Sequence, residues 1–142
     1  MATGFGAHEA PALSSDEIPP YQPVIVKPDL PRIKNPDFNQ IQITWVGHST
    51  FLIQMSGVNI LTDPIFNGRS SPFSFGGIKR LAPPGMKFDD LPPIHAVVIS
   101  HNHYDHLDAH TVERLGNEPK YLVPLGLARW FNKRKIENPS RV

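Results

Sequence analysis

Four residues of the kinds that bind metal ions stand within six positions in the second half of the chain. They are His101, His103, Asp105 and His106, in the pattern His-x-His-x-Asp-His. Neutral imidazole and carboxylate groups are zinc ligands, and a thiolate site is excluded because the chain has no cysteine. Left unpaired, these side chains would be costly to bury and would repel one another when protonated. The run therefore predicts a metal site.

The segment before this run is predicted to position it. Residues 96–99, Ala-Val-Val-Ile, are apolar throughout, which is typical of a strand covered on both faces. Residues at i and i+2 of an extended segment point to one side, so His101 and His103 are expected to share one ion. Asp105 and His106 follow in a turn and are expected to face a second ion. Two neighbouring ions sharing a water lower its pKa and generate hydroxide near pH 7.

Two residues outside the run are predicted to support the site. His48 follows a glycine in a loop and is expected to hydrogen-bond near the metal ligands, with a plain turn role as the alternative. Asp63 ends a strand next to Pro64 and is expected to orient a ligand, with a turn cap as the alternative. Of the remaining histidines, His8 lies in the N-terminal arm, and His95 and His110 are interpreted as incidental.

The hydrophobic pattern predicts an α+β domain over residues 39–142. Alternating or short apolar runs indicate three consecutive strands in an antiparallel meander, and later segments indicate a helix, a short strand and a second, basic helix. Residues 65–93 show no clean periodicity. The large apolar residues in that segment predict either local packing or a rim for an apolar substrate: Phe66, Phe73, Phe75, Met86 and Phe88. The expected elements are strands at 41–45, 51–55, 58–61, 94–100 and 121–123, and helices at 108–116 and 127–135.

Proline is the unusual component of the sequence, with 16 in 142 residues. Seven prolines fall in the first forty residues, where each removes a backbone donor and biases its predecessor toward extended geometry. Residues 1–38 are therefore expected to form an extended or disordered arm. The arm either stays in solvent or wraps a partner or the domain surface.

Charge and hydropathy exclude several classes of function. A net charge of +1 gives no electrostatic footprint for nucleic acid, so no nucleic-acid partner is expected. No window approaches 18 consecutive apolar residues, which excludes a membrane-spanning helix. The first residues carry neither a secretory nor a transit signal. A cytoplasmic or peripheral membrane location is the resulting expectation.

These motifs resemble the metallo-β-lactamase superfamily of binuclear zinc hydrolases. The His-x-His-x-Asp-His run matches its signature loop, and Thr62-Asp63-Pro64 matches the upstream motif that contains its structural aspartate. Within the superfamily, the chain is most similar to N-acylphosphatidylethanolamine-hydrolysing phospholipase D and its relatives, from about residue 38 onward. The segments that carry this similarity are 44–50, 60–64, 71–72, 79–80, 84–85, 90–92, 124–126 and 130–131.

The resemblance implies an αββα sandwich and two zinc ions. His101 and His103 would hold the first ion, Asp105 and His106 the second, and Asp105 would accept a proton during attack. Hydroxide would attack a phosphodiester and release an N-acylethanolamine and phosphatidic acid. A phospholipid substrate and peripheral membrane contact follow from the same resemblance. The residues that bind the substrate are left unassigned.

The chain departs from this family after His106. The family draws a histidine, a bridging aspartate and a final histidine from the second half of its sandwich, and the downstream sequence does not supply them. The chain is therefore expected to be the N-terminal half of such an enzyme, binding zinc weakly or not at all and inactive without the missing C-terminal half or a partner chain. The alternatives are a lactonase-like hydrolase of the same fold and a non-catalytic half-domain that acts through a partner chain.

Overall fold

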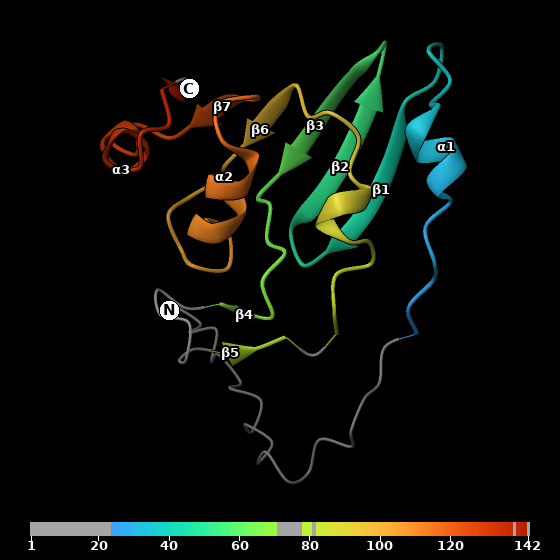
Figure 1. Cartoon of the computed structure of the whole chain (residues 1–142), viewed down its shortest axis with the longest axis horizontal. Coiled ribbons are helices and arrows are strands. Elements are labelled where there is room, and N and C mark those ends of the chain that lie inside the picture. The colour runs from blue at the N-terminus through green and yellow to red at the C-terminus, as the bar shows by residue number, and fades with distance from the viewer. Residues whose placement is uncertain (1–23, 71–77, 81, 138, 142) are drawn as a thin grey trace, which may run out of the picture.

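A six-stranded mixed β-sheet forms the body of the molecule in the computed structural model (Figure 1). The structure describes residues 24–70, 78–80, 82–137 and 139–141. Along the sheet the strands lie in the order β1-β2-β3-β6-β7-β8. Their bounds are β1 Gln42–Gly47, β2 Thr50–Met55, β3 Val58–Thr62, β6 Ala96–Val98, β7 Lys120–Val123 and β8 Pro139–Arg141.

The first three strands confirm the predicted antiparallel meander. β1 pairs antiparallel with β2, and β2 pairs antiparallel with β3. The β2–β3 turn consists of Ser56 and Gly57, whose φ angles are 48° and 77°. Positive φ at both central residues matches the right-handed twist of the flanking strands in a two-residue hairpin. Met55 and Val58 face each other across this turn, which fixes the register of the hairpin.

The remaining strands are parallel to one another and to β3. Thr62 at the end of β3 pairs with Val98 at the end of β6, and Val98 pairs in turn with Leu122 of β7. Parallel pairing brings the carboxyl ends of β3 and β6 to the same edge of the sheet. The residue after β3, Asp63, therefore lies beside the loop that follows β6, although about forty residues separate them in sequence.

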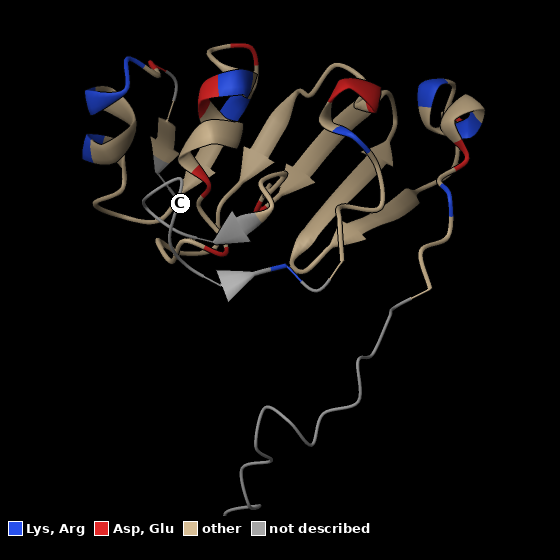
Figure 2. Ribbon diagram, turned by 60° about the horizontal axis from the view of Figure 1, so that its bottom comes forward, with Lys and Arg blue, Asp and Glu red and all other residues tan. Residues whose placement is uncertain are grey.

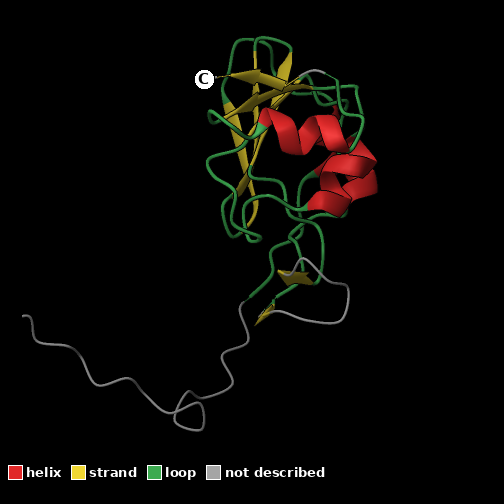
Figure 3. Cartoon of the chain, turned by 90° about the vertical axis from the view of Figure 1, so that its left-hand side faces the viewer, coloured by secondary structure: helices red, strands yellow, loops and turns green. Residues whose placement is uncertain are grey.

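The helices lie on one face of the sheet, as Figure 3 shows from the side. They are α1 (Leu30–Lys34), the 3₁₀ turn η1 (Phe88–Asp90), α2 (Ala109–Leu115) and α3 (Ala128–Lys133). As predicted, the Asp108 side chain caps α2 by accepting from the His110 N–H, and Gly116 ends it with a φ of 62°. The core lies between this helical layer and the sheet, with Leu52, Leu61, Val97, Val112, Tyr121, Val123 and Phe131 inaccessible to solvent.

The prediction of an extended arm through residue 38 is wrong for α1. Asp29 caps this short helix by accepting from the Arg32 N–H, and proline in its first turn removes only a donor that has no partner there. Ile33 is 2% exposed, and its carbonyl accepts from the buried Gln54 side chain of β2 at 2.9 Å. Contacts with the sheet therefore stabilise helix in a proline-rich segment. Residues 1–23 of the predicted arm lie outside the described part of the chain.

The segment at 65–93 is more structured than the sequence predicts. It contains a short antiparallel hairpin, β4 (Arg69–Ser70) with β5 (Ile78–Lys79), followed by η1. Met86 is buried in the core, and the Phe66 ring packs edge-on against Phe88 with centroids 5.4 Å apart. Local packing is thus the role of these residues, while Phe73 and Phe75 lie outside the described residues.

The sheet face opposite the helices is apolar and open in the described structure. Ile43 and Trp45 of β1 are 61% and 64% exposed. In register with them on this face lie further apolar side chains, namely Phe51, Ile53, Ile60, Ala96, Val98 and Leu122. Among the described residues β6 is covered on one face only, so the expectation of burial on both faces is not met here. A mixed sheet covered by helices on one side is one α/β half of the expected sandwich.

Candidate metal centre

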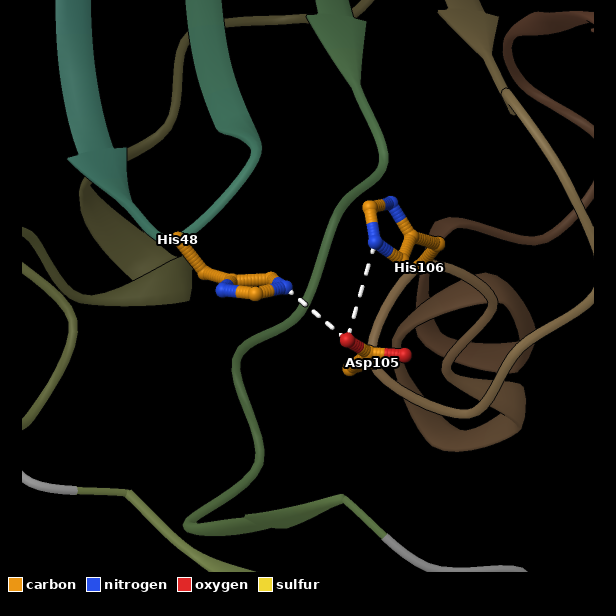
Figure 4. Close-up of side chains that lie close together, drawn as sticks. All are labelled: His48, Asp105 and His106. Carbon is orange, nitrogen blue, oxygen red and sulfur yellow. Dashed lines mark hydrogen bonds and ion pairs between the residues drawn. The ribbon is translucent and has the colours of Figure 1, made fainter. Parts of the chain in front are cut away.

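Three segments meet at the edge of the sheet where β1, β3 and β6 end. The β1–β2 turn contributes His48 and Ser49, the end of β3 contributes Asp63, and the loop after β6 contributes Ser100 to His106. The His48, Asp105 and His106 side chains point toward one another (Figure 4). All four predicted ligands and both predicted supporting residues thus fall within one connected cluster.

The backbone is unusual at two of these positions. His48 has a φ of 52° and Asp63 a φ of 35°, in the left-handed region that residues other than glycine rarely adopt. The Trp45 indole N–H donates to the His48 carbonyl at 2.9 Å, and the Thr50 hydroxyl donates to the Asp63 carbonyl at 2.8 Å. Non-glycine residues held in this region by their surroundings are often found at functional sites.

Asp63 orients His106. The His106 Nδ1 lies 2.9 Å from the Asp63 Oδ2, and the Ser49 hydroxyl is 3.1 Å from the same nitrogen. Because an ionised carboxylate only accepts, the hydrogen-bond pattern assigns the proton to Nδ1. The Nε2 lone pair is then free and faces the Asp105 carboxylate, whose Oδ2 is 3.6 Å away. Carboxylate-to-histidine hydrogen bonds of this kind fix the tautomer of metal-binding histidines.

Asp63 also acts on His101, through Ser100. Its buried carboxylate accepts from the Ser100 N–H and from the Ser100 hydroxyl, both at 2.7 Å. The Ser100 oxygen in turn lies 2.8 Å from the His101 Nδ1. Since the hydroxyl has given its only proton to Asp63, the network assigns the imidazole proton to Nδ1 and leaves the His101 Nε2 without a proton.

His101 and His103 are spaced as two ligands of one ion would be. The His101 Nε2 lies 3.1 Å from the His103 Nδ1. Two nitrogens bound to one tetrahedral zinc at ordinary Zn–N lengths are about 3.3 Å apart. This distance agrees with the expectation from the sequence that His101 and His103, as alternate residues, turn to the same side. The His101 ring is also 4.0 Å from the His106 ring, centroid to centroid, so this pair adjoins the rest of the cluster.

His48, Asp105 and His106 form a second group. Their ligand atoms lie within 4.8 Å of one another, so these three side chains could hold one metal ion. The His48 Nε2 is 3.1 Å from the Asp105 Oδ2. Burial by itself raises the pKa of the Asp105 carboxyl, but a backbone hydrogen bond and the neighbouring His106 and His48 together lower it below its ordinary value. The carboxylate is therefore ionised and ready to bind a cation at neutral pH.

The donor chemistry of the cluster fits divalent metal ions. Five side chains offer imidazole nitrogen or carboxylate oxygen, in one group of three and an adjacent pair. Three protein ligands are the usual number at a catalytic zinc, and His48, Asp105 and His106 provide that number for one ion. The sequence predicts four possible metal ligands in the loop, and the fold places His48 beside them as a fifth.

Sequence reasoning missed the two serines that contact His106. Ser100 directly precedes the ligand run, and a hydroxyl near a strand end next to histidine was the available signal. Ser49 gave no such signal, because only the fold brings the β1–β2 turn to His106. Of the other histidines, His95 accepts from the Asn59 N–H at 2.9 Å and His110 is exposed, while His8 lies outside the described residues.

The helix-covered mixed sheet and the histidine-rich loop at its edge are typical of one half of the metallo-β-lactamase fold (Figure 3). A family model described as "Beta-lactamase superfamily domain" matches residues 42–140, and the chain belongs to this family. The fold is also similar to that of a solved structure described as a possible metal-dependent hydrolase from Veillonella parvula. That similarity has a TM-score of 0.60 at 18% identity and covers 71% of this chain and 42% of the other.

Two curated relatives carry more specific names. The chain is 48% identical over 96 residues to the N-acyl-phosphatidylethanolamine-hydrolyzing phospholipase D 1 of Caenorhabditis elegans, and 30% identical over 97 residues to the mitochondrial protein of that name in Saccharomyces cerevisiae. The matches cover 66% and 67% of this chain, but only 27% and 20% of the relatives. The chain therefore spans about a quarter of the length of these proteins.

Proposed function

We propose that this chain carries the N-terminal half of the active site of a zinc-dependent phosphodiester hydrolase that acts on N-acylphosphatidylethanolamine. The observation that carries the proposal is the hydrogen-bond network of Asp63, which leaves the Nε2 atoms of His101 and His106 unprotonated and facing His103 and Asp105. The 48% identity to a phospholipase of this name supports the substrate. Such a substrate lies in a bilayer, which the enzyme would contact peripherally.

His101 and His103 are the proposed ligands of one zinc ion, and Asp105 and His106 those of a second. When bound, the ions supply Lewis-acid chemistry and lower the pKa of a water toward neutrality. Asp105, ionised and oriented by His48, accepts the proton of the attacking water. Attack at phosphorus breaks the bond between phosphorus and the ethanolamine oxygen. That oxygen takes up the proton removed from the water, so that phosphatidic acid and an N-acylethanolamine are released. Asp63 keeps the His106 proton on Nδ1 throughout.

We further propose that a second sheet of the same sandwich covers the open apolar face. Leaving Ile43 and Trp45 exposed in water forgoes a favourable burial of about 25 cal/mol for each square ångström. An exposed apolar surface that continues across several strands is typical of an interaction site. Polypeptide that corresponds to the rest of the relatives' length is the proposed occupant, and it would add the remaining metal ligands. The chain alone would then bind zinc weakly and have no turnover.

The test compares the 142-residue chain with the complete gene product. The complete protein is expected to bind two zinc ions and to release phosphatidic acid from N-acylphosphatidylethanolamine in mixed vesicles, measured by mass spectrometry. Removing the metal with a chelator should abolish the release, and added zinc should restore it. Asp105→Asn should lower turnover at least about a hundredfold, since general-base groups contribute that much or more.

Glu118→Gln provides a matched carboxylate-to-amide control at an exposed position on the loop after α2. It should leave both zinc content and turnover unchanged. A sugar-phosphate lactone serves as the competing substrate, and preference for it would contradict the phospholipid assignment. Turnover by the purified 142-residue chain, free of the complete protein, would contradict the assignment of this chain to half of the site.

A further inference from the structure

A cleft of about 690 Å³ opens beside the metal-binding loop. One wall is formed by the loop residues from Ser100 to Leu107, including His101 and Tyr104. The opposite wall is formed by the segment that leads into α3 and by α3 itself, including Trp130. The cleft therefore runs from the edge of the proposed metal centre to a helix that the proposed chemistry does not use.

The charge of this cleft is positive. Arg129 and Lys133 line it from α3, where a spacing of four residues places them on the same side of the helix. Both side chains are exposed, and within the described ranges neither has an ion-pair partner. No aspartate or glutamate is among the residues that line the cleft. In Figure 2, blue segments of the ribbon mark Lys and Arg positions along α3.

A third cation, Arg134 at the end of α3, differs from these two because it has partners within the protein. The Arg134 Nε lies 3.3 Å from a Glu113 carboxylate oxygen, and its guanidinium stacks over the Trp130 ring at 3.8 Å. Packing of α3 against α2 thus accounts for Arg134. It does not account for Lys133, nor for Arg129, which lies in the first turn, where the helix dipole disfavours a cation.

We propose that this cleft is a binding site for a phosphomonoester group. Two adjacent cations match the charge of a phosphomonoester. Its second pKa is close to that of a phosphorylated side chain, so it carries a charge of about −1.5 to −2 near pH 7. The Tyr104 and Asn102 side chains offer polar groups on the other wall, and Leu125 and Trp130 offer apolar surface for the carbon chain that bears the phosphate. The guanidinium of Arg129 suits bidentate contact with phosphate oxygens.

This inference deepens the proposed function, on which its role in the reaction depends. Hydrolysis converts a phosphodiester with one negative charge into a phosphomonoester with nearly two. A cationic cleft adjoining the metal centre would accept that additional charge, so Arg129 and Lys133 are assigned to holding the product phosphate. The binding itself requires no metal and can be tested without turnover.

The test uses the only two tryptophans of the chain, Trp45 and Trp130. In the Trp45→Phe background Trp130 becomes the single reporter, and the chain is kept in a chelator so that no metal binds the phosphate. Glycerol 3-phosphate should change the Trp130 fluorescence in a saturable way. Arg129→Gln and Lys133→Gln should each weaken this binding about tenfold or more, the loss typical of a hydrogen bond to a charged group.

A second arm distinguishes the source of the phosphate. The same variants are sedimented with phosphatidylcholine vesicles that contain phosphatidic acid, and with phosphatidylcholine alone. Binding of glycerol 3-phosphate supports a site for the phosphate group itself. Binding of phosphatidic acid vesicles alone, lost in Arg129→Gln, supports a site that needs the lipid headgroup at a bilayer.

The matched control is Lys34→Gln in α1, at the other end of the sheet (Figure 1). Lys34 is exposed, so its neutralisation changes the net charge equally without touching the cleft. It should leave both binding arms unchanged. Equal weakening by Lys34→Gln, or no binding of either probe, would overturn the inference. Because the metal is absent throughout, that result would leave the proposed hydrolase function standing.

Discussion

Replacing Asp63 with asparagine is the sharpest test of how the proposed metal ligands are oriented. The change keeps the shape of the side chain and removes its charge. In the structure both carboxylate oxygens accept, one from the Ser100 N–H and the other from the Ser100 hydroxyl and the His106 Nδ1. An amide has only one accepting oxygen, so its NH₂ group must face a donor whichever way it turns.

The expected loss of stability follows from these contacts. Asp63 is 6% exposed, so a lost contact is not replaced by solvent. At least one hydrogen bond to a charged acceptor disappears, and a donor is left unsatisfied. Each of these effects costs about 1–3 kcal/mol in buried sites, so a decrease of about 2–4 kcal/mol in the free energy of unfolding is expected. The affinity for zinc should fall about 10- to 100-fold, as it does when partners of metal-binding histidines are removed.

Two measurements on Asp63→Asn check this reasoning. Urea unfolding followed by circular dichroism gives the stability change. Long-range ¹H–¹⁵N NMR of the metal-free protein reports the tautomer of His106, which should be the Nδ1–H form in the parent chain and a mixture in the variant. Glu118→Gln, the exposed carboxylate-to-amide control, should change neither quantity. An Nδ1–H tautomer that persists in Asp63→Asn, with an unchanged unfolding midpoint, would refute the orienting role of Asp63.

Two further predictions concern the scaffold. The buried Tyr121 hydroxyl donates to the Val112 and Gly116 carbonyls, so Tyr121→Phe should lower stability by about 1 kcal/mol at pH 7. Burial raises the pKa of Tyr121 above its value of about 10 in the unfolded chain. The stability that Tyr121 contributes is therefore present below about pH 10 and declines above it. Urea unfolding at about pH 7 and about pH 10.5 should show that the difference in unfolding free energy between parent and variant narrows at the higher pH. Gly47 has a φ of 137°, and an added Cβ would lie 2.7 Å from the Arg80 Nη2. Gly47→Ala should therefore cost about 1–3 kcal/mol by the same assay, and an unchanged midpoint would contradict the backbone strain.

The elements that could be predicted from the sequence are those fixed by local pattern. Alternation of apolar and polar residues indicated the first strand of the meander and short apolar runs the next two, which a two-residue turn at Ser56 joins. Asp108 and Gly116 marked the ends of α2 because a side-chain acceptor and a left-handed residue satisfy the exposed backbone groups there. The ligand run was recognisable because its residue types have few other uses at a strand end.

What could not be predicted depends on contacts between distant segments. α1 forms in a proline-rich stretch because Ile33 packs in the core and its carbonyl binds Gln54, a partner 21 residues away. An apolar strand does not reveal which of its faces is covered, and so the burial of β6 was overestimated. Ser49 reaches His106 across 57 residues, through strand pairing that no local pattern encodes. For His48 the sequence predicted a position near the ligand run, but not that its partner is Asp105.

The structure also separates the positioning of the ligands from the completion of the active site. Every hydrogen bond that orients His101 and His106 comes from β3, from the β1–β2 turn or from the loop itself. None of these partners lies on the open sheet face, so covering that face is not needed to set the tautomers. Under the proposed function, a second layer would instead bury Trp45 and its neighbours, supply further ligands and exclude water. One α/β layer thus orients His101 and His106 by itself, and the proposed second layer is needed only for turnover under the proposed function.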